Sequence, residues 1–293
     1  MARSPAHKFG QIIGDVLELA VVPLLQKFAS EHQLFLDRKG PRSCRDSIKC
    51  SWVDRNGNSH DLDFVLERGG SDKQFGAPVA FIEVAWRRYT KHSRNKAQEI
   101  QGAIEPLADT HFATAPFKGA ILAGDFTSGA LTQLRSLGFS VLYFSYDSVV
   151  SVFREFGIDA AFDESTADSA FRSKVRAYAS LKPQEKSRLP VRLLAAHDND
   201  VSAFMNALEA SVLRQIECVV VLLLYGTARE LQTVDEAIAY IETHAGADNG
   251  NLKRYELEVR YSNGDAIVGR FKKREDAIAF LLQYQPARPP GNR

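Results

Sequence analysis

The spacing of apolar residues predicts alternating helices and strands over roughly the first half of the chain. Apolar positions recur at helical spacing over residues 9–28, which predicts one long amphipathic helix. A hairpin with strands at 49–53 and 60–67 is predicted around Asn56-Gly57, a pair suited to a tight turn. Further strands are predicted at 78–86, 118–123 and 140–144, and further helices at 93–108, 128–137, 148–156 and 170–181.

The order of these elements predicts the fold class. An antiparallel hairpin comes first, and strands that alternate with helices follow it, as in parallel strand-helix-strand units. We therefore expect an α/β domain with an α-β-β-β-α-β core, in which helices flank a mixed central sheet. The strand at 78–86 is apolar on both of its faces except at Glu83, which is typical of a strand in the middle of such a sheet.

A polar segment bracketed by prolines, residues 183–190, indicates a boundary between two domains. We expect a first domain over residues 1–182, a linker over 183–197, a smaller α+β domain over 198–285, and a disordered tail over 286–293. In the second domain, residues 235–241 (DEAIAYI) and 275–281 (EDAIAFL) resemble each other, and each follows strand-like sequence. This similarity indicates a duplicated strand-helix unit.

Composition and charge narrow the classes of function. The chain has 45% hydrophobic and 25% charged residues, as ordinary globular proteins do. Its longest uncharged apolar run, 218–225, is shorter than the roughly 20 residues that a membrane helix needs, and its start lacks a signal-peptide core. We therefore expect a cytoplasmic protein with three free cysteines. The net charge of +1 means that a nucleic-acid site requires a local basic cluster.

Acidic residues in predicted strands are the first candidates for chemistry. Asp61 and Asp63 share one face of the second hairpin strand. Glu83 interrupts an apolar strand, where an ionised carboxylate is costly unless a cation or several donors meet it. A solvated strand face explains the aspartates as well, and an ion pair to Arg87 or Arg88 is the alternative for Glu83. Carboxylates on adjoining strands favour Mg²⁺, which binds one or two protein carboxylates together with phosphate oxygens.

Two basic segments accompany these acids. Residues 87–96 (RRYTKHSRNK) contain five basic residues, and the loop 37–45 contains four. Such loops are usually solvated, but beside carboxylates they can hold phosphates while the acids hold a metal. The predicted DNA-contacting residues are Arg87, Arg88, Lys91, Arg94, Arg38, Lys39, Arg42 and Arg45.

These residues resemble the PD-(D/E)XK nuclease superfamily, which includes most type II restriction endonucleases. The resemblance covers about residues 9–150, with Asp63 at the family's aspartate and Glu83 at the first acid of its (D/E)-X-K half-motif. Ala85 stands at the position of the family's lysine, which is thought to orient or activate the attacking water. In some branches a lysine on the following helix takes this role, and Lys96 is our candidate, ahead of Lys91 and Arg87. Asp61 is a further candidate metal ligand, and Glu18 a weaker one.

The resemblance implies a Mg²⁺-dependent endonuclease that hydrolyses double-stranded DNA, either a restriction enzyme or a related defence nuclease. Asp63, Glu83 and Lys96 are its predicted catalytic residues, with one or two Mg²⁺ ions. A homodimer is expected, since cutting both strands of a palindrome favours two-fold symmetry, and the second domain is a candidate for dimerisation or target recognition. No glycine-rich phosphate loop, paired-histidine zinc motif or GxSxG elbow occurs, so no organic cofactor is expected.

Two alternatives stay open. One is a nuclease-fold protein that binds nucleic acid without cutting it, for which Ala85 is the mark of lost chemistry. The other is a nuclease that acts on RNA or on branched DNA.

Overall fold

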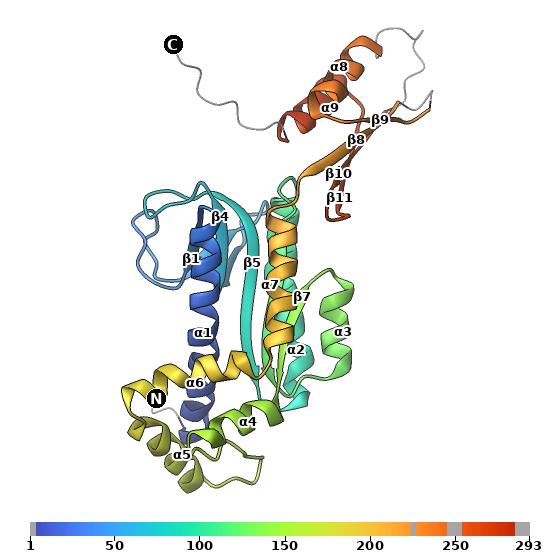
Figure 1. The fold of residues 1–293 in the computed structure, drawn as a ribbon. Coiled ribbons are helices and arrows are strands. Elements are labelled where there is room, and N and C mark those ends of the chain that lie inside the picture. Colours follow the sequence, from blue (N-terminus) through green and yellow to red (C-terminus); the bar gives the residue numbers. More distant parts are fainter. Residues whose placement is uncertain (1–3, 224–226, 245–253, 285–293) are drawn as a thin grey trace. The chain divides into compact units, whose positions relative to one another are not determined.

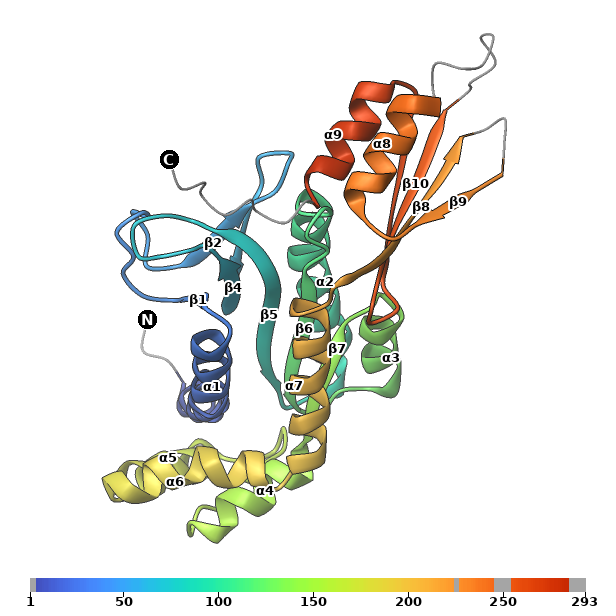
Figure 2. The same cartoon turned by 45° about the horizontal axis from the view of Figure 1, so that its top comes forward.

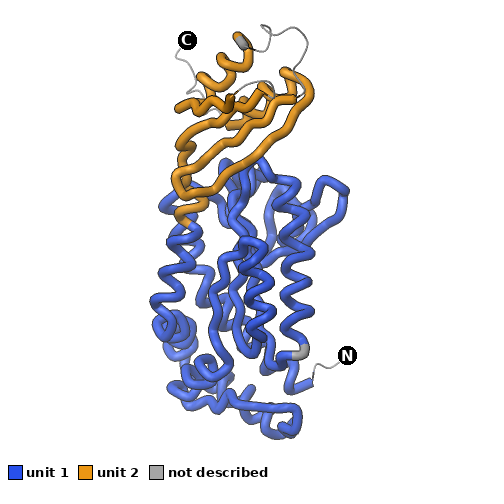
Figure 3. The backbone as a smooth tube through the Cα atoms, turned by 90° about the vertical axis from the view of Figure 1, so that its right-hand side faces the viewer, with its two compact units in different colours: residues 1–208 blue, residues 209–293 orange. Residues whose placement is uncertain are grey.

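The computed structural model describes residues 4–223, 227–244 and 254–284 (Figure 1). The chain divides into two compact units, residues 1–208 (unit 1) and 209–293 (unit 2), which Figure 3 colours separately. None of the described helices combines the length and the apolar character needed to cross a membrane. The elements up to residue 155 are α1 (Pro5–Glu31), β1 (Leu34–Arg38), β2 (Cys50–Val53), β3 (Ser59–Leu62), β4 (Phe64–Arg68), β5 (Ala77–Arg87), the short 3-10 helix η1 (Thr90–His92), α2 (Ser93–Thr110), β6 (Phe117–Gly124), α3 (Ser128–Ser136), β7 (Ser140–Ser145) and α4 (Tyr146–Glu155).

A mixed sheet with the strand order β1-β4-β5-β6-β7 forms the centre of unit 1 (Figure 2). Strands β1, β4 and β5 pair antiparallel, and β5, β6 and β7 pair parallel. Helices lie on both faces. Phe81 and Ala85 of β5 pack in one apolar cluster with Ile100 of α2, whereas Trp86, on the opposite face of β5, approaches Gly10 of α1. This arrangement confirms the predicted α/β class with a mixed sheet flanked by helices.

The predicted hairpin is divided between two sheets. Strands β2 and β3 pair only with each other, whereas β4 belongs to the central sheet. The chain changes direction at Asp63, which lies between β3 and β4. The residue pattern also did not predict β1, a short strand that pairs with β4 at the edge of the sheet.

The predicted linker at 183–197 is largely helical. Unit 1 continues with α5 (Asp168–Ser180) and α6 (Pro183–Ala195), and α7 (Asp198–Val212) crosses the division between the units. A proline is tolerated in the first turn of a helix, where its missing N–H would have no intrahelical partner, and Leu189 and Leu193 provide a buried stripe on α6. The division falls after Leu208 rather than before residue 198, because α7 packs in unit 1, with Phe204 5.5 Å from the Phe117 ring.

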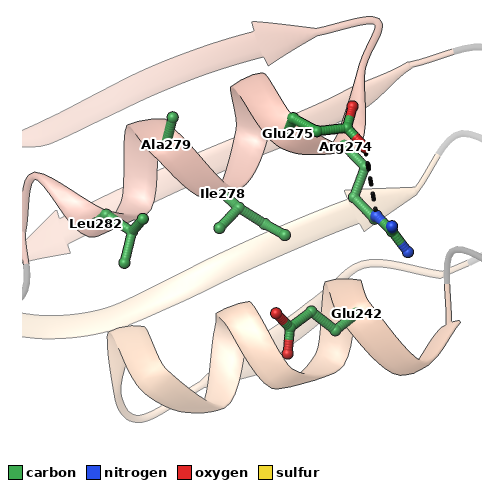
Figure 4. A pocket seen from close by; sticks show the side chains of 6 residues that line it. All are labelled: Glu242, Arg274, Glu275, Ile278, Ala279 and Leu282. Carbon is green, nitrogen blue, oxygen red and sulfur yellow. Dashed lines mark ion pairs between the residues drawn. The ribbon is translucent and has the colours of Figure 1, made fainter.

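Unit 2 contains an antiparallel sheet of order β11-β10-β8-β9 and two helices. Each half of its sequence supplies two strands and then a helix, and β8 and β10, the first strand of each half, pair at the centre. The helices α8 and α9 lie side by side, and a cavity of about 490 Å³ between them is lined by Glu242, Ile278 and Leu282, among others (Figure 4). The predicted tail at 286–293 lies outside the described residues. The elements are β8 (Ile216–Leu223), β9 (Arg229–Leu231), α8 (Val234–His244), β10 (Tyr255–Tyr261), β11 (Ala266–Phe271) and α9 (Arg274–Leu282).

Candidate active site

Asp63 and Glu83 meet where β4 begins beside β5. The register pairs Phe64 with Ile82, so the next positions along the two strands are Asp63 and Glu83. The Val84 N–H donates to Asp63 Oδ2 at 2.7 Å, and the Asp63 N–H donates to Glu83 Oε1 at 3.2 Å. Each carboxylate thus accepts a hydrogen bond from the backbone of the other strand. At the bend, the Asp63 side chain thus bonds the β5 backbone directly.

Glu83 is the more buried of the two acids. It is 6% exposed and lies on the face of β5 that packs against α2. Burial, followed by the negative charge of Asp63, raises the pKa of Glu83 to about 8. Burial also raises the pKa of Asp63, against the opposing effects of the Val84 N–H and of Lys96 and Lys39. Ionising both acids of the metal-free pair is therefore unfavourable, and Glu83 keeps its proton up to about pH 8.

Lys96 reaches this pair from the first turn of α2. Its Nζ lies 3.6 Å from Glu83 Oε2 and 3.5 Å from Glu99 Oε2, and its side chain is 17% exposed. The alternative ion pairs for Glu83 do not form, since Arg87 approaches Glu99 and Arg88 binds Asp125. Three residues that are far apart in the sequence, Asp63, Glu83 and Lys96, are thus brought to one place.

Two further charged residues border the pair. Arg38 pairs with Phe64 at the end of the β1–β4 ladder, and the charge of the next residue, Lys39, lowers the pKa of Asp63. On α1, burial raises the pKa of Glu18, the negative charges of Asp63 and Asp15 raise it further, and Lys39 lowers it. Glu18 and Lys39 are therefore both close enough to the pair to interact with it electrostatically.

Asp61 is not brought to the pair. It lies on β3, where it accepts hydrogen bonds from Lys49 Nζ at 2.5 Å and Ser51 Oγ at 2.6 Å, and its side chain is 49% exposed. The Lys49 and Ser51 contacts lower its pKa. The predicted shared strand face of Asp61 and Asp63 is wrong, because the chain leaves the β2–β3 sheet between the two residues. Asp61 is held by a surface ion pair.

Arg42 and Arg45, predicted to contact DNA, are instead part of a buried ion-pair network. Arg42 binds Glu67 through both terminal nitrogens, at 2.6 and 3.0 Å, and lies 2.9 Å from Asp37. Arg45 contacts both Asp37 oxygens, at 3.0 and 2.8 Å. Because Asp37 and Glu67 are almost completely buried, these guanidinium groups are required inside the fold. Arg38 and Lys39, in contrast, are exposed.

The basic segment after β5 is also divided between two roles. Arg88 donates to the Phe162 carbonyl at 2.6 Å and to Asp125 Oδ2 at 2.5 Å, and its guanidinium lies 3.8 Å from the centre of the Tyr146 ring. These contacts fasten the segment to the rest of unit 1, so the predicted backbone-contacting role does not suit Arg88. Arg94 is exposed. Arg87 is partly exposed, and the Lys91 side chain lies outside the described residues.

The donor set at the Asp63–Glu83 pair fits Mg²⁺. Mg²⁺ prefers oxygen ligands and usually binds one or two protein carboxylates, with water and substrate phosphates completing its octahedron. Within the described part of the chain, no group of three or more histidine, cysteine, aspartate or glutamate side chains is arranged as a metal site. Asp63 and Glu83 would supply two carboxylates to such an ion, and water or substrate oxygens would complete its coordination.

A second polar cluster in unit 1 links α4 to the junction of α6 and α7. Ser148 Oγ lies 2.5 Å from His197 Nε2, and His197 Nδ1 lies 3.3 Å from Asp200 Oδ2. Serine hydrolases use this order of groups. Here, however, the Ser148 N–H donates to Ser145 Oγ, and the His197 ring packs edge-on against Phe144. The contacts fasten three helices together, and a structural role accounts for them.

The comparisons with known proteins give little guidance. No protein-family model matches the chain, and no curated protein does. One solved structure, described as a protein of unknown function, AF1548, has a TM-score of 0.25 and 9% sequence identity, over 64% of this chain and 99% of its own. A similarity at this level carries no argument about fold or activity.

Proposed function

We propose that unit 1 is a Mg²⁺-dependent DNA endonuclease of the PD-(D/E)XK type, related to restriction enzymes or other defence nucleases. The observation that carries the proposal is the Asp63–Glu83 pair, in which Glu83 is buried and Asp63 partly buried, with Lys96 beside it. The order of the elements along the chain supports it. Helix α1 is followed by strands that include β4 and β5, and then by α2 and β6. This order is compatible with the α-β-β-β-α-β core of that superfamily.

Each of the three residues has a distinct role in this proposal. Asp63 and Glu83 hold Mg²⁺, which supplies Lewis-acid stabilisation of the charge that develops on the phosphate. Lys96 positions the attacking water and places a positive charge beside the reacting phosphate. At position 85 the family's lysine is replaced by Ala85, whose side chain is buried in the apolar cluster against α2. Lys96, one turn into that helix, is the cation that lies beside Glu83 instead.

The test is cleavage of supercoiled plasmid by the full chain, with Mg²⁺ or with EDTA. Asp63→Asn and Glu83→Gln are each expected to abolish Mg²⁺-dependent cleavage, since an amide keeps the volume but loses the ligand charge. Asp61→Asn is the matched control, because it removes a nearby carboxylate that points elsewhere, and it is expected to keep normal activity.

The outcomes separate the proposal from its alternatives. Cleavage that persists in folded Glu83→Gln protein would remove the assignment of the site. DNA binding without cleavage by the wild-type protein, with Mg²⁺ or Mn²⁺, would favour the non-cutting nucleic-acid-binding protein that Ala85 permits. Preferential cleavage of RNA or of branched DNA would change the substrate but keep the site.

A further inference from the structure

A basic cleft lies between the start of α1 and the middle of α5. Its volume is about 460 Å³, and its lining residues are Pro5, Lys8, Arg172, Val175 and Arg176. The helix α5 packs against α1 (Figure 1), and residues three and four apart on α5 share the face that lines the cleft. The described lining residues therefore combine three cations with a small apolar surface and include no acidic residue.

These three cations are exposed and, unlike the buried arginines of unit 1, have no carboxylate partner among the described residues. Arg42, for example, has its charge matched by Asp37 and Glu67. In the described part of the chain, the side chains of these cations make one hydrogen bond, from Arg176 Nε to the Arg172 carbonyl at 3.4 Å, and no ion pair. Like charges gathered around one concave surface repel one another, and a bound anion relieves that repulsion.

We propose that this cleft, formed by Lys8, Arg172 and Arg176, binds a phosphate of the DNA backbone, as a contact separate from the Asp63–Glu83 pair. The inference rests on the proposed nuclease function for the identity of its ligand. Arginine suits this ligand, because the planar guanidinium binds phosphate oxygens through two parallel hydrogen bonds.

The cleft lies on the helix that also carries Glu18, whose pKa the charge of Asp63 raises. Lys8 and Glu18 are ten residues apart, which corresponds to about 15 Å along the helix axis at 1.5 Å per residue. In B-DNA that length corresponds to about four or five base pairs.

The experiment compares two triple variants of the full chain. The first, Lys8→Ala with Arg172→Ala and Arg176→Ala, removes the cleft cations. The control, Lys27→Ala with Arg55→Ala and Arg135→Ala, removes the same number of positive charges from exposed positions elsewhere in unit 1. Binding of a fluorescent 30-base-pair duplex is measured in EDTA at several salt concentrations, and thermal unfolding confirms that both variants are folded.

The cleft variant is expected to bind DNA at least about tenfold more weakly than wild type, and about equally so for unrelated sequences. The slope of log K against log salt should become shallower by about 0.9 for each phosphate that the variant no longer neutralises. The control should keep the wild-type slope. Equal decreases in affinity in the two variants, or an unchanged slope in the cleft variant, would overturn the inference.

Further results identify which phosphate the cleft binds and separate a failure of this inference from a failure of the nuclease proposal. If inorganic phosphate raises the unfolding temperature of wild type but not of the cleft variant, while DNA affinity is the same in both, the cleft binds a small anion and the DNA assignment fails. If wild type cuts DNA in a Glu83-dependent way and the cleft variant binds normally, only this inference fails. If DNA binding depends on the cleft but no cleavage occurs, the cleft stands and the nuclease proposal fails.

Discussion

Replacing Glu83 with glutamine is expected to stabilise the metal-free protein at alkaline pH. Burial and the neighbouring Asp63 raise the pKa of Glu83 from 4.5 to about 8. Between these pH values the folded protein binds a proton that the unfolded chain has released, so the free energy of unfolding falls as the pH rises. Glutamine has no proton to release, so the free energy of unfolding of the variant does not decrease for this reason.

The size of the effect follows from the shift in pKa. The difference between 8 and 4.5 is 3.5, and one pKa unit corresponds to about 1.36 kcal/mol, which gives about 5 kcal/mol above pH 8. The pKa of about 8 already includes the opposing effect of the Lys96 charge. We therefore expect Glu83→Gln to be more stable than wild type by up to about 5 kcal/mol at pH 9, and to differ from it little at pH 5. In a unit of this size, a stabilisation of about 5 kcal/mol raises the unfolding temperature by about 10–20 °C.

The assay is thermal unfolding of the full chain in EDTA at pH 5, 7 and 9, repeated with Mg²⁺. Mg²⁺ is expected to raise the unfolding temperature of wild type at pH 9 but not that of Glu83→Gln, because the variant lacks a charged ligand. Glu67→Gln is the matched control. Glu67 is equally buried but pairs with Arg42, so its replacement is expected to destabilise the fold by about 3–5 kcal/mol.

The result that refutes this reasoning is a decrease in stability of Glu83→Gln at pH 9 that matches the decrease in Glu67→Gln. Glu83 would then be a structural ion-pair partner of Lys96 rather than an acid whose burial lowers the free energy of unfolding. The assignment of the Asp63–Glu83 pair as a cation site would lose its physical basis.

Three further predictions concern the same region. Lys96→Met should lower the cleavage rate by about 10²–10⁴-fold while changing DNA affinity only slightly; an equal decrease in affinity would make Lys96 a binding residue. The affinity for Mg²⁺ should increase about tenfold per pH unit up to about pH 8, because Glu83 must lose its proton, and calorimetry in buffers of different ionisation enthalpy should detect its release. Arg88→Ala should lower the unfolding temperature with little effect on DNA binding, whereas Arg94→Ala should weaken DNA binding with little effect on stability; the reverse pattern would restore Arg88 as a phosphate contact.

Much of the architecture of unit 1 could be predicted from residue patterns, because its helices and strands have strong periodicity. The apolar stripe of α1, and the strand β5 that is apolar on both faces around Glu83, identify the elements on which Glu18 and Glu83 lie. The bend at Asp63 could not be predicted in this way, since the alternation of Leu62, Phe64 and Leu66 continues through it without interruption. The bend coincides with a hydrogen bond from β5 to the Asp63 side chain, a contact between distant parts of the chain that the local pattern does not contain.

The helix α6 was missed for a different reason. Prolines at 183 and 190 favour a break when they are considered locally. In the structure Pro183 begins the helix, and Pro190, inside it, is buried with Leu189 and Leu193. The packing of this stripe outweighs the hydrogen bond that Pro190 cannot donate.

The described part of unit 1 contains two pairs of acids at buried or partly buried positions, and their surroundings distinguish a structural pair from a candidate site. Asp37 and Glu67 meet two arginines whose guanidinium groups contact their oxygens at 2.6–3.0 Å, so the charges on each side balance. Asp63 and Glu83 have one lysine at 3.6 Å, and burial holds the pKa of both acids above their usual values. The same sequence pattern, an acid in an apolar strand, occurs at Glu67 and Glu83. The two residues differ in their ion-pair partners, which only the structure shows. A buried charge that the chain leaves without full compensation is costly for folding alone, and a bound cation is the kind of ligand that removes this cost.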